Sequence, residues 1–184
     1  MKRGLLWMML MTLALVMASG AALSATKQFC PNRSDGSCYG TKKADAMIGR
    51  PAGNDEMYGR GGDDLMRGYD GDDYLQGDGG KDKLYGGGRN DILWGGGGTR
   101  ANPNDRRNDV VHGGDGEDYI YSGFAEGGVD RVFGDDGNDI VEAQRAYGFP
   151  RTTDIVNCGG GRDDTVYFDR GVDEVKNCER KVPR

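Results

Sequence analysis

Residues 59–94 decide the fold, because they read as four nonapeptides in one frame: GRGGDDLMR, GYDGDDYLQ, GDGGKDKLY and GGGRNDILW. Glycine dominates the first and fourth places, aspartate fills the sixth, and leucine or methionine fills the eighth. Between residues 40 and 168, twelve units carry both the aspartate and an apolar eighth residue. A fixed period of this kind predicts a repeat fold in which each unit packs against its neighbours.

Each place of the nonapeptide has a physical role. The first six residues must turn sharply, and glycine supplies the positive-φ conformations and close backbone approach that a Cβ atom would obstruct. The last three form a minimal strand, in which the eighth residue points inward and its neighbours point outward. Two units make one coil, and successive coils stack as parallel strands about 4.8 Å apart. We therefore expect an all-β fold, a parallel β-roll that is a two-sheet β-solenoid.

The eighth places predict a core that is one side chain thick. The residues expected there are Met47, Met57, Met66, Leu75, Leu84, Leu93, Val111, Ile120, Val132, Val141, Val156 and Val166. At roughly 1.5–3 kcal/mol each, their burial contributes a few tens of kcal/mol. Ordering the chain costs on the order of 1–2 kcal/mol for each backbone residue. So thin a core predicts that the roll needs a further source of stability.

The sixth-place aspartates indicate what that source is. Stacking brings the aspartates of units i and i+2 close together, where two carboxylates repel each other. A Ca²⁺ ion between stacked loops removes this conflict, because it takes six to eight oxygen ligands at about 2.3–2.6 Å in irregular geometry. Mg²⁺ fits less well, since it is smaller and loses water reluctantly. We expect several Ca²⁺ ions and a chain that is largely unfolded without them.

Because consecutive matches fall in one frame across residues 40–168, the chain resembles the hemolysin-type calcium-binding (RTX) nonapeptide-repeat family. The resemblance implies a β-roll with Ca²⁺ held between stacked Gly/Asp loops by sixth-place aspartates and backbone carbonyls. Its strongest ligands would be Asp55, Asp64, Asp73, Asp82, Asp91, Asp118 and Asp139. Weaker candidates, beside eroded loops, insertions or ends, are Asp109, Asp130, Asp154 and Asp164, together with Asp45. Arg100 replaces the aspartate of one unit, which predicts the loss of one bridging site there.

Three interruptions break the array, at residues 95–103, 122–124 and 143–148. Long loops on repeat scaffolds often lie on one face and can carry binding, and Tyr147 and Phe149 are the apolar hints of a partner there. We favour tolerated insertions, because each coil of a solenoid touches only its neighbours.

The N-terminus predicts export. Lys2 and Arg3 form a basic start, Leu5 to Val16 is an apolar core, and small residues follow from Ala18 to Ala25. This pattern is typical of a secretory signal peptide, removed by the general export route and leaving no membrane insertion. We divide the chain into a cleaved signal peptide (residues 1–25), an N-terminal disulfide cap (26–39), a calcium-binding repeat domain (40–168) and a C-terminal cap and tail (169–184). The tail alternates apolar residues and is expected to add a final capping strand.

Four cysteines fit an oxidising compartment. They allow three pairings, of which the local one, Cys30 with Cys38 and Cys158 with Cys178, would close each end of the array. A zinc site is disfavoured, because there is no C-x-x-C pair and His112 is the single histidine. Without the signal peptide the net charge is −8, from 22 basic and 30 acidic residues, which disfavours nucleic acid and anionic membrane as partners.

Together these features predict a secreted calcium-binding protein with calcium ions as its partner. The alternative is a Ca²⁺-dependent adhesion or structural module that presents outward aromatic residues to a cell-surface or glycan partner; the candidates are Tyr74, Tyr85, Trp94, Tyr119 and Tyr121. Such residues more often stabilise the outer face of a sheet. A secreted hydrolase or lyase is less favoured, because H-E-x-x-H and G-x-S-x-G are absent and His112 falls in an outward place. We therefore predict no catalytic residues.

Overall fold

The computed structural model of the protein describes residues 26–30, 37–96, 108–122, 128–143 and 152–184. Within these ranges the chain forms sixteen short β-strands and no helix, so none that could cross a membrane. The odd-numbered strands are β1 (Thr26–Phe29), β3 (Asp45–Ile48), β5 (Leu65–Asp70), β7 (Lys83–Gly88), β9 (Val110–Asp115), β11 (Arg131–Asp136), β13 (Ile155–Asn157) and β15 (Glu174–Lys176). The even-numbered strands are β2 (Ser37–Tyr39), β4 (Glu56–Tyr58), β6 (Tyr74–Gln76), β8 (Ile92–Trp94), β10 (Tyr119–Tyr121), β12 (Ile140–Glu142), β14 (Thr165–Phe168) and β16 (Arg180–Pro183).

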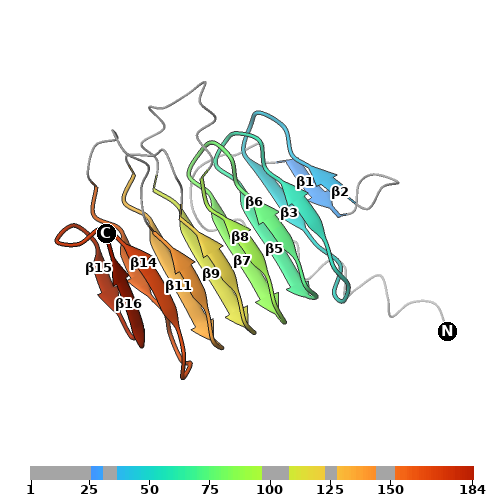
Figure 1. The fold of residues 1–184 in the computed structure, drawn as a ribbon. Coiled ribbons are helices and arrows are strands. Elements are labelled where there is room, and N and C mark those ends of the chain that lie inside the picture. The colour runs from blue at the N-terminus through green and yellow to red at the C-terminus, as the bar shows by residue number, and fades with distance from the viewer. Residues whose placement is uncertain (1–25, 31–36, 97–107, 123–127, 144–151) are drawn as a thin grey trace, which may run out of the picture.

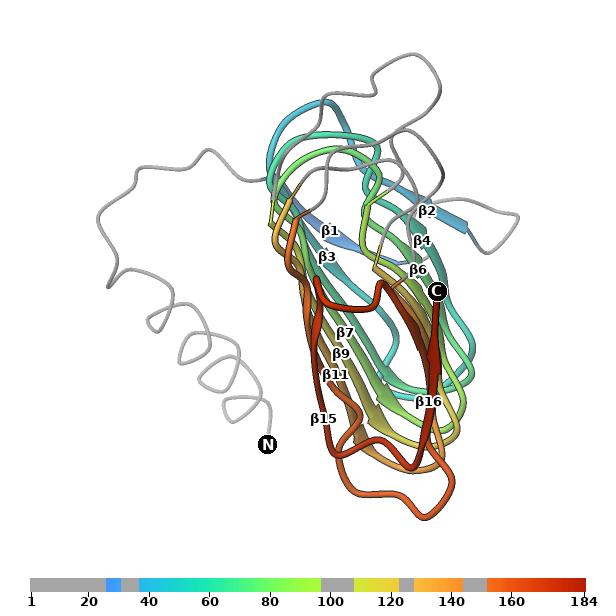
Figure 2. The same ribbon diagram turned by 60° about the vertical axis from the view of Figure 1, so that its left-hand side comes forward.

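The strands alternate between two sheets, so two consecutive strands complete one coil. One sheet has the order β1-β3-β5-β7-β9-β11-β13-β15 and the other has the order β16-β14-β12-β10-β8-β6-β4-β2. The strand pairings within both sheets are parallel. The coils stack in chain order from blue to red in Figure 1, and the two sheets face each other in Figure 2. The predicted parallel β-roll is confirmed.

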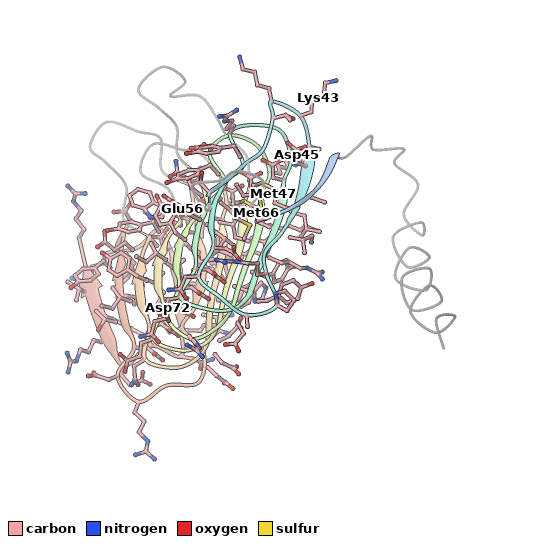
Figure 3. The ribbon with its side chains drawn as sticks, turned by 90° about the vertical axis from the view of Figure 1, so that its right-hand side faces the viewer. Lys43, Asp45, Met47, Glu56, Met66 and Asp72 are labelled. Atoms are coloured by element: carbon pink, nitrogen blue, oxygen red, sulfur yellow. A yellow bond between two sulfur atoms is a disulfide. The ribbon has the colours of Figure 1, made fainter. Side chains whose placement is uncertain are left out.

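The core is the predicted single row of side chains. All twelve eighth-place residues expected there are 0% exposed. The register keeps them aligned, since Met66 pairs with Leu84 and Leu84 pairs with Val111. Figure 3 shows Met47 and Met66 inside the roll, and the outward seventh and ninth places remain partly or fully exposed. Each strand from β3 to β14 thus contributes one buried apolar side chain to this row, because the alternation of strand side chains sends its neighbours outward.

The chain turns at two edges of the roll, and the edges differ. At the regular edge an odd strand leads to the next even strand through closely similar glycine loops, namely residues 49–54, 68–72, 86–90, 113–117, 134–138 and 158–163. At the interrupted edge an even strand leads to the next odd strand. The three interruptions expected from the sequence all fall in connections of the interrupted edge, largely outside the described residues. Lys43 and Asp72 mark the interrupted and the regular edge in Figure 3.

Both ends of the roll contain more strand than the sequence predicts. The segment expected to be a disulfide cap contributes β1 and β2, one to each sheet. The tail likewise adds two strands, β15 and β16, where one was expected. The cysteines form the local pairs Cys30–Cys38 and Cys158–Cys178. A disulfide therefore closes each end of the array, where coils have a neighbour on one side alone.

Candidate metal centre

Two ladders of buried carboxyl groups run along the roll, one at each edge. The ladder of the regular edge consists of Asp55, Asp73, Asp91, Asp118, Asp139 and Asp164, and Glu179 ends it. The ladder of the interrupted edge consists of Asp45, Asp64, Asp82, Asp109, Asp130 and Asp154, and Asp173 ends it. All twelve sixth-place aspartates are at most 4% exposed.

From Asp64 and Asp73 onward, one carboxyl oxygen of each rung accepts a hydrogen bond from the backbone of the coil before it. Asp73 donates its backbone N–H to Asp91 Oδ1 at 2.8 Å, and Asp91 donates in the same way to Asp118 Oδ1 at 2.8 Å. The same bond repeats along both ladders at 2.7–3.1 Å. Each aspartate thereby satisfies a buried backbone donor where a strand begins. The structure brings together aspartates of units i and i+2, as the nonapeptide period predicts.

In six of the described rungs the other carboxyl oxygen has no hydrogen-bond partner. In the part of the chain that the structure describes, Oδ2 is buried and accepts no hydrogen bond in Asp64, Asp73, Asp91, Asp118, Asp139 and Asp164. A buried polar atom without a partner is destabilising by about 1–3 kcal/mol, and more when it carries charge. A row of such atoms therefore requires a counter-group that the protein itself does not supply.

These oxygens face a space that glycine keeps open. A Cβ atom on Gly113 would lie 2.2 Å from Asp118 Oδ2 and 2.6 Å from the carbonyl oxygen of Gly134, one coil further on. A Cβ atom on Gly68 would likewise lie 2.1 Å from Oδ2 of Asp73 and 2.6 Å from the next carbonyl oxygen. A carboxylate oxygen and a carbonyl oxygen thus converge beside the first-place glycine, which explains why glycine dominates that place.

Burial makes these carboxyl groups reluctant to ionise. Burial is the main cause that raises the pKa of Asp91 to about 8; the bond from the Asp73 backbone opposes the rise, and neighbouring carboxylates add to it. By the same causes the pKa rises to about 7 in Asp64 and Asp139 and to about 6 in Asp73 and Asp118. Near neutral pH the ladders are therefore poised between a protonated form and an ionised form that needs a cation.

The donor set fits Ca²⁺. No three His, Cys, Asp or Glu side chains among the described residues converge as a metal-binding group, so a cation here would need backbone carbonyls to complete its shell. Carboxylate and carbonyl oxygens are the ligands that Ca²⁺ takes, and it accepts irregular arrangements of them. The partnerless Oδ2 atoms and the carbonyls of the next coil offer these ligands, as the sequence predicts.

A second row of polar side chains lines the outside of the regular edge. Its members occupy the fifth place of each loop and alternate between neutral and acidic residues: Asn54, Asp72, Asn90, Glu117, Asn138 and Asp163. Asp72 donates its backbone N–H to Asn54 Oδ1 at 3.0 Å, and Glu117 donates to Asn90 Oδ1 at 3.0 Å. The alternation keeps carboxylates of adjacent coils apart in this outer row, in contrast to the inner ladder.

The structure places every ligand candidate of the sequence in one of the two ladders. Asp109 and Asp130 are included despite their eroded glycine loops, and Asp45, ranked among the weakest, is the first rung of the interrupted edge. Arg100 lies outside the described residues, and the ladder continues past it from Asp82 to Asp109.

The sequence analysis missed two rungs at the C-terminal end. Asp173 and Glu179 accept the backbone N–H groups of Asp154 and Asp164. Asp173 had a signal, because Val175 follows it at the spacing of the sixth and eighth places. Glu179 had none, since Lys181 stands where the apolar residue would be and is exposed.

Comparison with known proteins supports this geometry. A family model described as the RTX calcium-binding nonapeptide repeat, in four copies, matches residues 52–75, 76–99 and 105–125. Searches of curated proteins and of solved structures found no match. The matched residues supply the central rungs of both ladders and the glycine loops beside them. The chain thus carries the repeats of the RTX calcium-binding family, and its fold is a calcium-binding β-roll.

Proposed function

We propose that this protein is a secreted calcium-binding protein whose roll forms when Ca²⁺ enters between its stacked loops. The observation that carries the proposal is the row of buried Oδ2 atoms without hydrogen-bond partners, set beside carbonyl oxygens of the next coil. When bound, Ca²⁺ supplies the positive charge and the coordination that these oxygens lack. The sixth-place aspartates and the loop carbonyls are the residues proposed to hold it.

Calcium binding and folding are coupled because the roll is unfavourable without the ion. The aspartates must leave water to join the ladder, and at neutral pH they must either take up protons or face one another as carboxylates. A core one side chain thick offers little apolar burial to offset this. Because the carbonyls and carboxylates of a site come from different coils, the site exists after the coils have stacked.

Export is supported by two features. Both disulfides close within the repeat scaffold, and stable disulfides are typical of oxidising compartments outside the cytosol. The basic and apolar N-terminal stretch has the pattern of a signal peptide, but it lies outside the described residues. Secretion by the general export route therefore remains part of the proposal.

The surroundings of His112 favour a structural role over catalysis. Its ring is stacked between Tyr85 and Phe133, with centroid distances of 5.3 and 4.4 Å. Its Nδ1 lies 2.9 Å from Asp135 Oδ2. A histidine with both ring faces covered and one nitrogen engaged stabilises the outer face of the sheet, so we propose that the protein is not an enzyme.

The outward aromatic residues also favour sheet stability over adhesion. Trp94 and Tyr121 stack at 4.3 Å, and Tyr39 and Tyr58 stack at 5.0 Å. Rings stacked along the coil axis cover each other's faces and present their edges outward. A glycan packs against the exposed face of an aromatic ring, which this arrangement does not offer. We therefore place the adhesion module second to a calcium-binding role.

The proposal is tested by titrating Ca²⁺ into the mature, disulfide-intact chain and following far-UV circular dichroism. We expect little strand signal in EDTA, a cooperative gain with Ca²⁺, and a much weaker response to Mg²⁺. Metal analysis of the dialysed protein should find several calcium ions per chain. A strand-rich spectrum in EDTA that Ca²⁺ leaves unchanged, with no calcium retained, would overturn the proposal.

A further inference from the structure

The first loop of the regular edge that the structure describes in full, residues 49–54, differs from the loop stacked on it. Residues 49–54 contain one residue more than residues 68–72, and the second residue of this longer loop is Arg50. Arg50 folds back onto the aspartate that ends its own loop, Asp55. The sequence shows the extra residue but gives no indication of what it accomplishes.

Arg50 supplies partners to both oxygens of the Asp55 carboxylate. Its backbone N–H donates to Oδ2 at 2.7 Å, and its Nε donates to Oδ1 at 2.9 Å. Its Nη2 also donates to the carbonyl oxygen of Asn54. The guanidinium group thus binds Oδ1 and a carbonyl oxygen of its own loop, while the backbone N–H occupies Oδ2, the oxygen that has no hydrogen-bond partner in Asp73 and Asp91.

The surrounding loop is shaped for this contact. The side chain of Asp55 is 0% exposed, while that of Arg50 is 45% exposed, so the charge pair is half-sheltered at its outer end. Gly53 has a φ of +128° and leaves room beneath the guanidinium, since a Cβ atom there would lie 3.4 Å from Arg50 Cζ. One coil further on, Asp73 has the same burial, but its Oδ2 has no partner.

We propose that Arg50 takes the place of a calcium ion at the first loop of the regular edge, so that Asp55 is a rung of the ladder but not a calcium ligand. This inference rests on the proposed function. With the guanidinium on Oδ1 and the backbone N–H on Oδ2, neither carboxylate oxygen of Asp55 is free, and the positive charge repels a divalent cation. The Asp55 rung is then complete without calcium.

A resident cation at this position gives the roll a starting surface. The coil formed by β3 and β4 has one of its two buried carboxylates, that of Asp55, neutralised by the chain itself. This coil lies next to the coil closed by the Cys30–Cys38 disulfide. Later coils stack on this surface as calcium arrives. Forming a new coil on an existing one avoids the entropy of starting a solenoid from an unfolded chain.

An exposed ion pair would not indicate that an arginine replaces calcium, because ion pairs on the surface contribute little to stability. Arg89 provides that comparison within the same edge. It pairs with Asp70 at 3.2 Å, but both side chains are exposed, at 66% and 59%. Removing Arg89 leaves a hydrated carboxylate, whereas removing Arg50 leaves a buried one without a counter-charge.

The test compares Arg50→Gln with Arg89→Gln and Arg50→Lys in the full mature chain at saturating Ca²⁺. Bound calcium is counted by equilibrium dialysis, with circular dichroism to establish that each variant is folded. We expect Arg50→Gln to bind one ion more than the unchanged protein, because its amide oxygen and Asp55 become available. Arg89→Gln should keep the original number of bound calcium ions, since the guanidinium of Arg50 remains in place. Arg50→Lys should keep it too, since the ammonium group is still a cation beside Asp55.

A second measurement does not depend on a variant folding. Hydrogen exchange of the unchanged protein in EDTA should show amides of β3 and β4 exchanging at least tenfold more slowly than those of β7 to β12. Equal exchange along the chain, or an unchanged ion count in a folded Arg50→Gln, overturns the role of Arg50 while calcium binding stands. Absence of calcium from the unchanged protein instead overturns the proposed function and this inference with it.

Discussion

The regular and the interrupted edge carry aspartate ladders of the same length, although their loops differ. At the regular edge, Asp73 and Asp91 are joined at 2.8 Å across 18 residues of chain. At the interrupted edge, Asp82 and Asp109 are joined at the same distance across 27 residues. The ladder therefore depends on where strands begin and not on the length of chain between them. Insertions are tolerated by the fold because each coil is positioned by its neighbours.

The space beside the carboxylate does depend on the loop. A Cβ atom on Gly113 at the regular edge would meet Asp118 Oδ2 at 2.2 Å. A Cβ atom on Gly95 at the interrupted edge would first meet the Ser122 carbonyl oxygen, at 3.0 Å, and then a methyl group of Val111. The uninterrupted loops of the same edge keep the close arrangement, since a Cβ atom on Gly59 would lie 2.4 Å from Asp64 Oδ2 and 2.6 Å from the carbonyl oxygen of Gly77. The wider space therefore belongs to the insertion at Gly95 and not to the edge as a whole. We expect the weaker calcium site beside that insertion.

The largest expected effect is that of pH on calcium affinity. Folded pKa values of about 6 to 8 in Asp73, Asp91, Asp118 and Asp139 lie above the ordinary value of 3.8, so folding without calcium takes up protons between about pH 4 and 8. The ion-free roll is therefore most stable on the acid side and loses stability as the pH rises through this window. Calcium competes with those protons for the carboxylates of the folded roll, so its affinity for the folded roll should be weaker at pH 5.5 than at pH 8. Because protons stabilise the ion-free roll, the strand signal in EDTA should be larger at pH 5.5 than at pH 8, and added Ca²⁺ should increase it less. Circular dichroism with EDTA and with Ca²⁺ at the two pH values measures this, and a strand signal in EDTA that does not change with pH would contradict it.

The next effect separates a regular loop from the interrupted loop at Gly95 sterically. Gly113→Ala should destabilise the calcium-loaded roll by about 3 kcal/mol, because the new methyl group overlaps both a carboxylate oxygen and a carbonyl oxygen. Gly95→Ala should cost about 1 kcal/mol, since its neighbours need to move by a few tenths of an ångström. Denaturant unfolding at saturating Ca²⁺ provides the comparison. Gly88→Ala is the control, as its nearest neighbour would be 3.8 Å away. Equal losses at Gly113 and Gly95 would remove the distinction between the two loops.

Replacing an aspartate by asparagine tests the carboxylate charge itself, because the side chain keeps its shape. Asp91→Asn keeps the shape and one oxygen acceptor but removes the charge, so the calcium midpoint should rise about tenfold, or about 1.4 kcal/mol. In EDTA at pH 8 the same variant should retain more strand signal than the unchanged protein, because a buried carboxyl group with a pKa of about 8 no longer has to ionise. Asp109→Asn at the interrupted edge should shift the calcium midpoint less. A larger shift for Asp109→Asn would place the tighter site beside the insertion.

The smallest effect concerns backbone strain at the regular edge. Tyr69 occupies the second place of its loop with a φ of +82° and is 44% exposed, so its side chain gains little from packing. Tyr69→Gly should raise the stability of the calcium-loaded roll by about 1 kcal/mol, because glycine adopts this conformation without strain. A thermal melt at saturating Ca²⁺ measures the change. Lys81→Gly, at a loop position without positive φ, should lower stability, and a loss of stability in both variants would argue against strain at Tyr69.

Most of the fold could be predicted because the period leaves little freedom. A strand of three residues has one inward place, so the eighth residue had to be the core and the sixth had to be where each strand begins. Met47 and Val166, at opposite ends of the array, are both 0% exposed for this reason. The aspartate ladder follows from the same arithmetic of two units per coil.

What escaped prediction lies where the period breaks. Asp173 belongs to a unit without its glycine loop, and Glu179 to one without its apolar residue. Arg50 lies in a loop that contains one residue more than the regular repeat. A periodic pattern does not reveal that its side chain binds the carboxylate that ends the same loop. The three insertions share one edge because each of them lies between an even-numbered strand and the next odd-numbered strand.

The neutral and acidic residues that alternate along the outer row of the regular edge repeat every second coil. Excising the coil that carries Asn90 would set Asp72 directly on Glu117, whereas excising two adjacent coils would restore an amide between acids. The roll can therefore be lengthened or shortened with least electrostatic penalty in steps of four nonapeptides. Gene duplication or protein engineering that adds coils in pairs would preserve this arrangement, and an odd number would not.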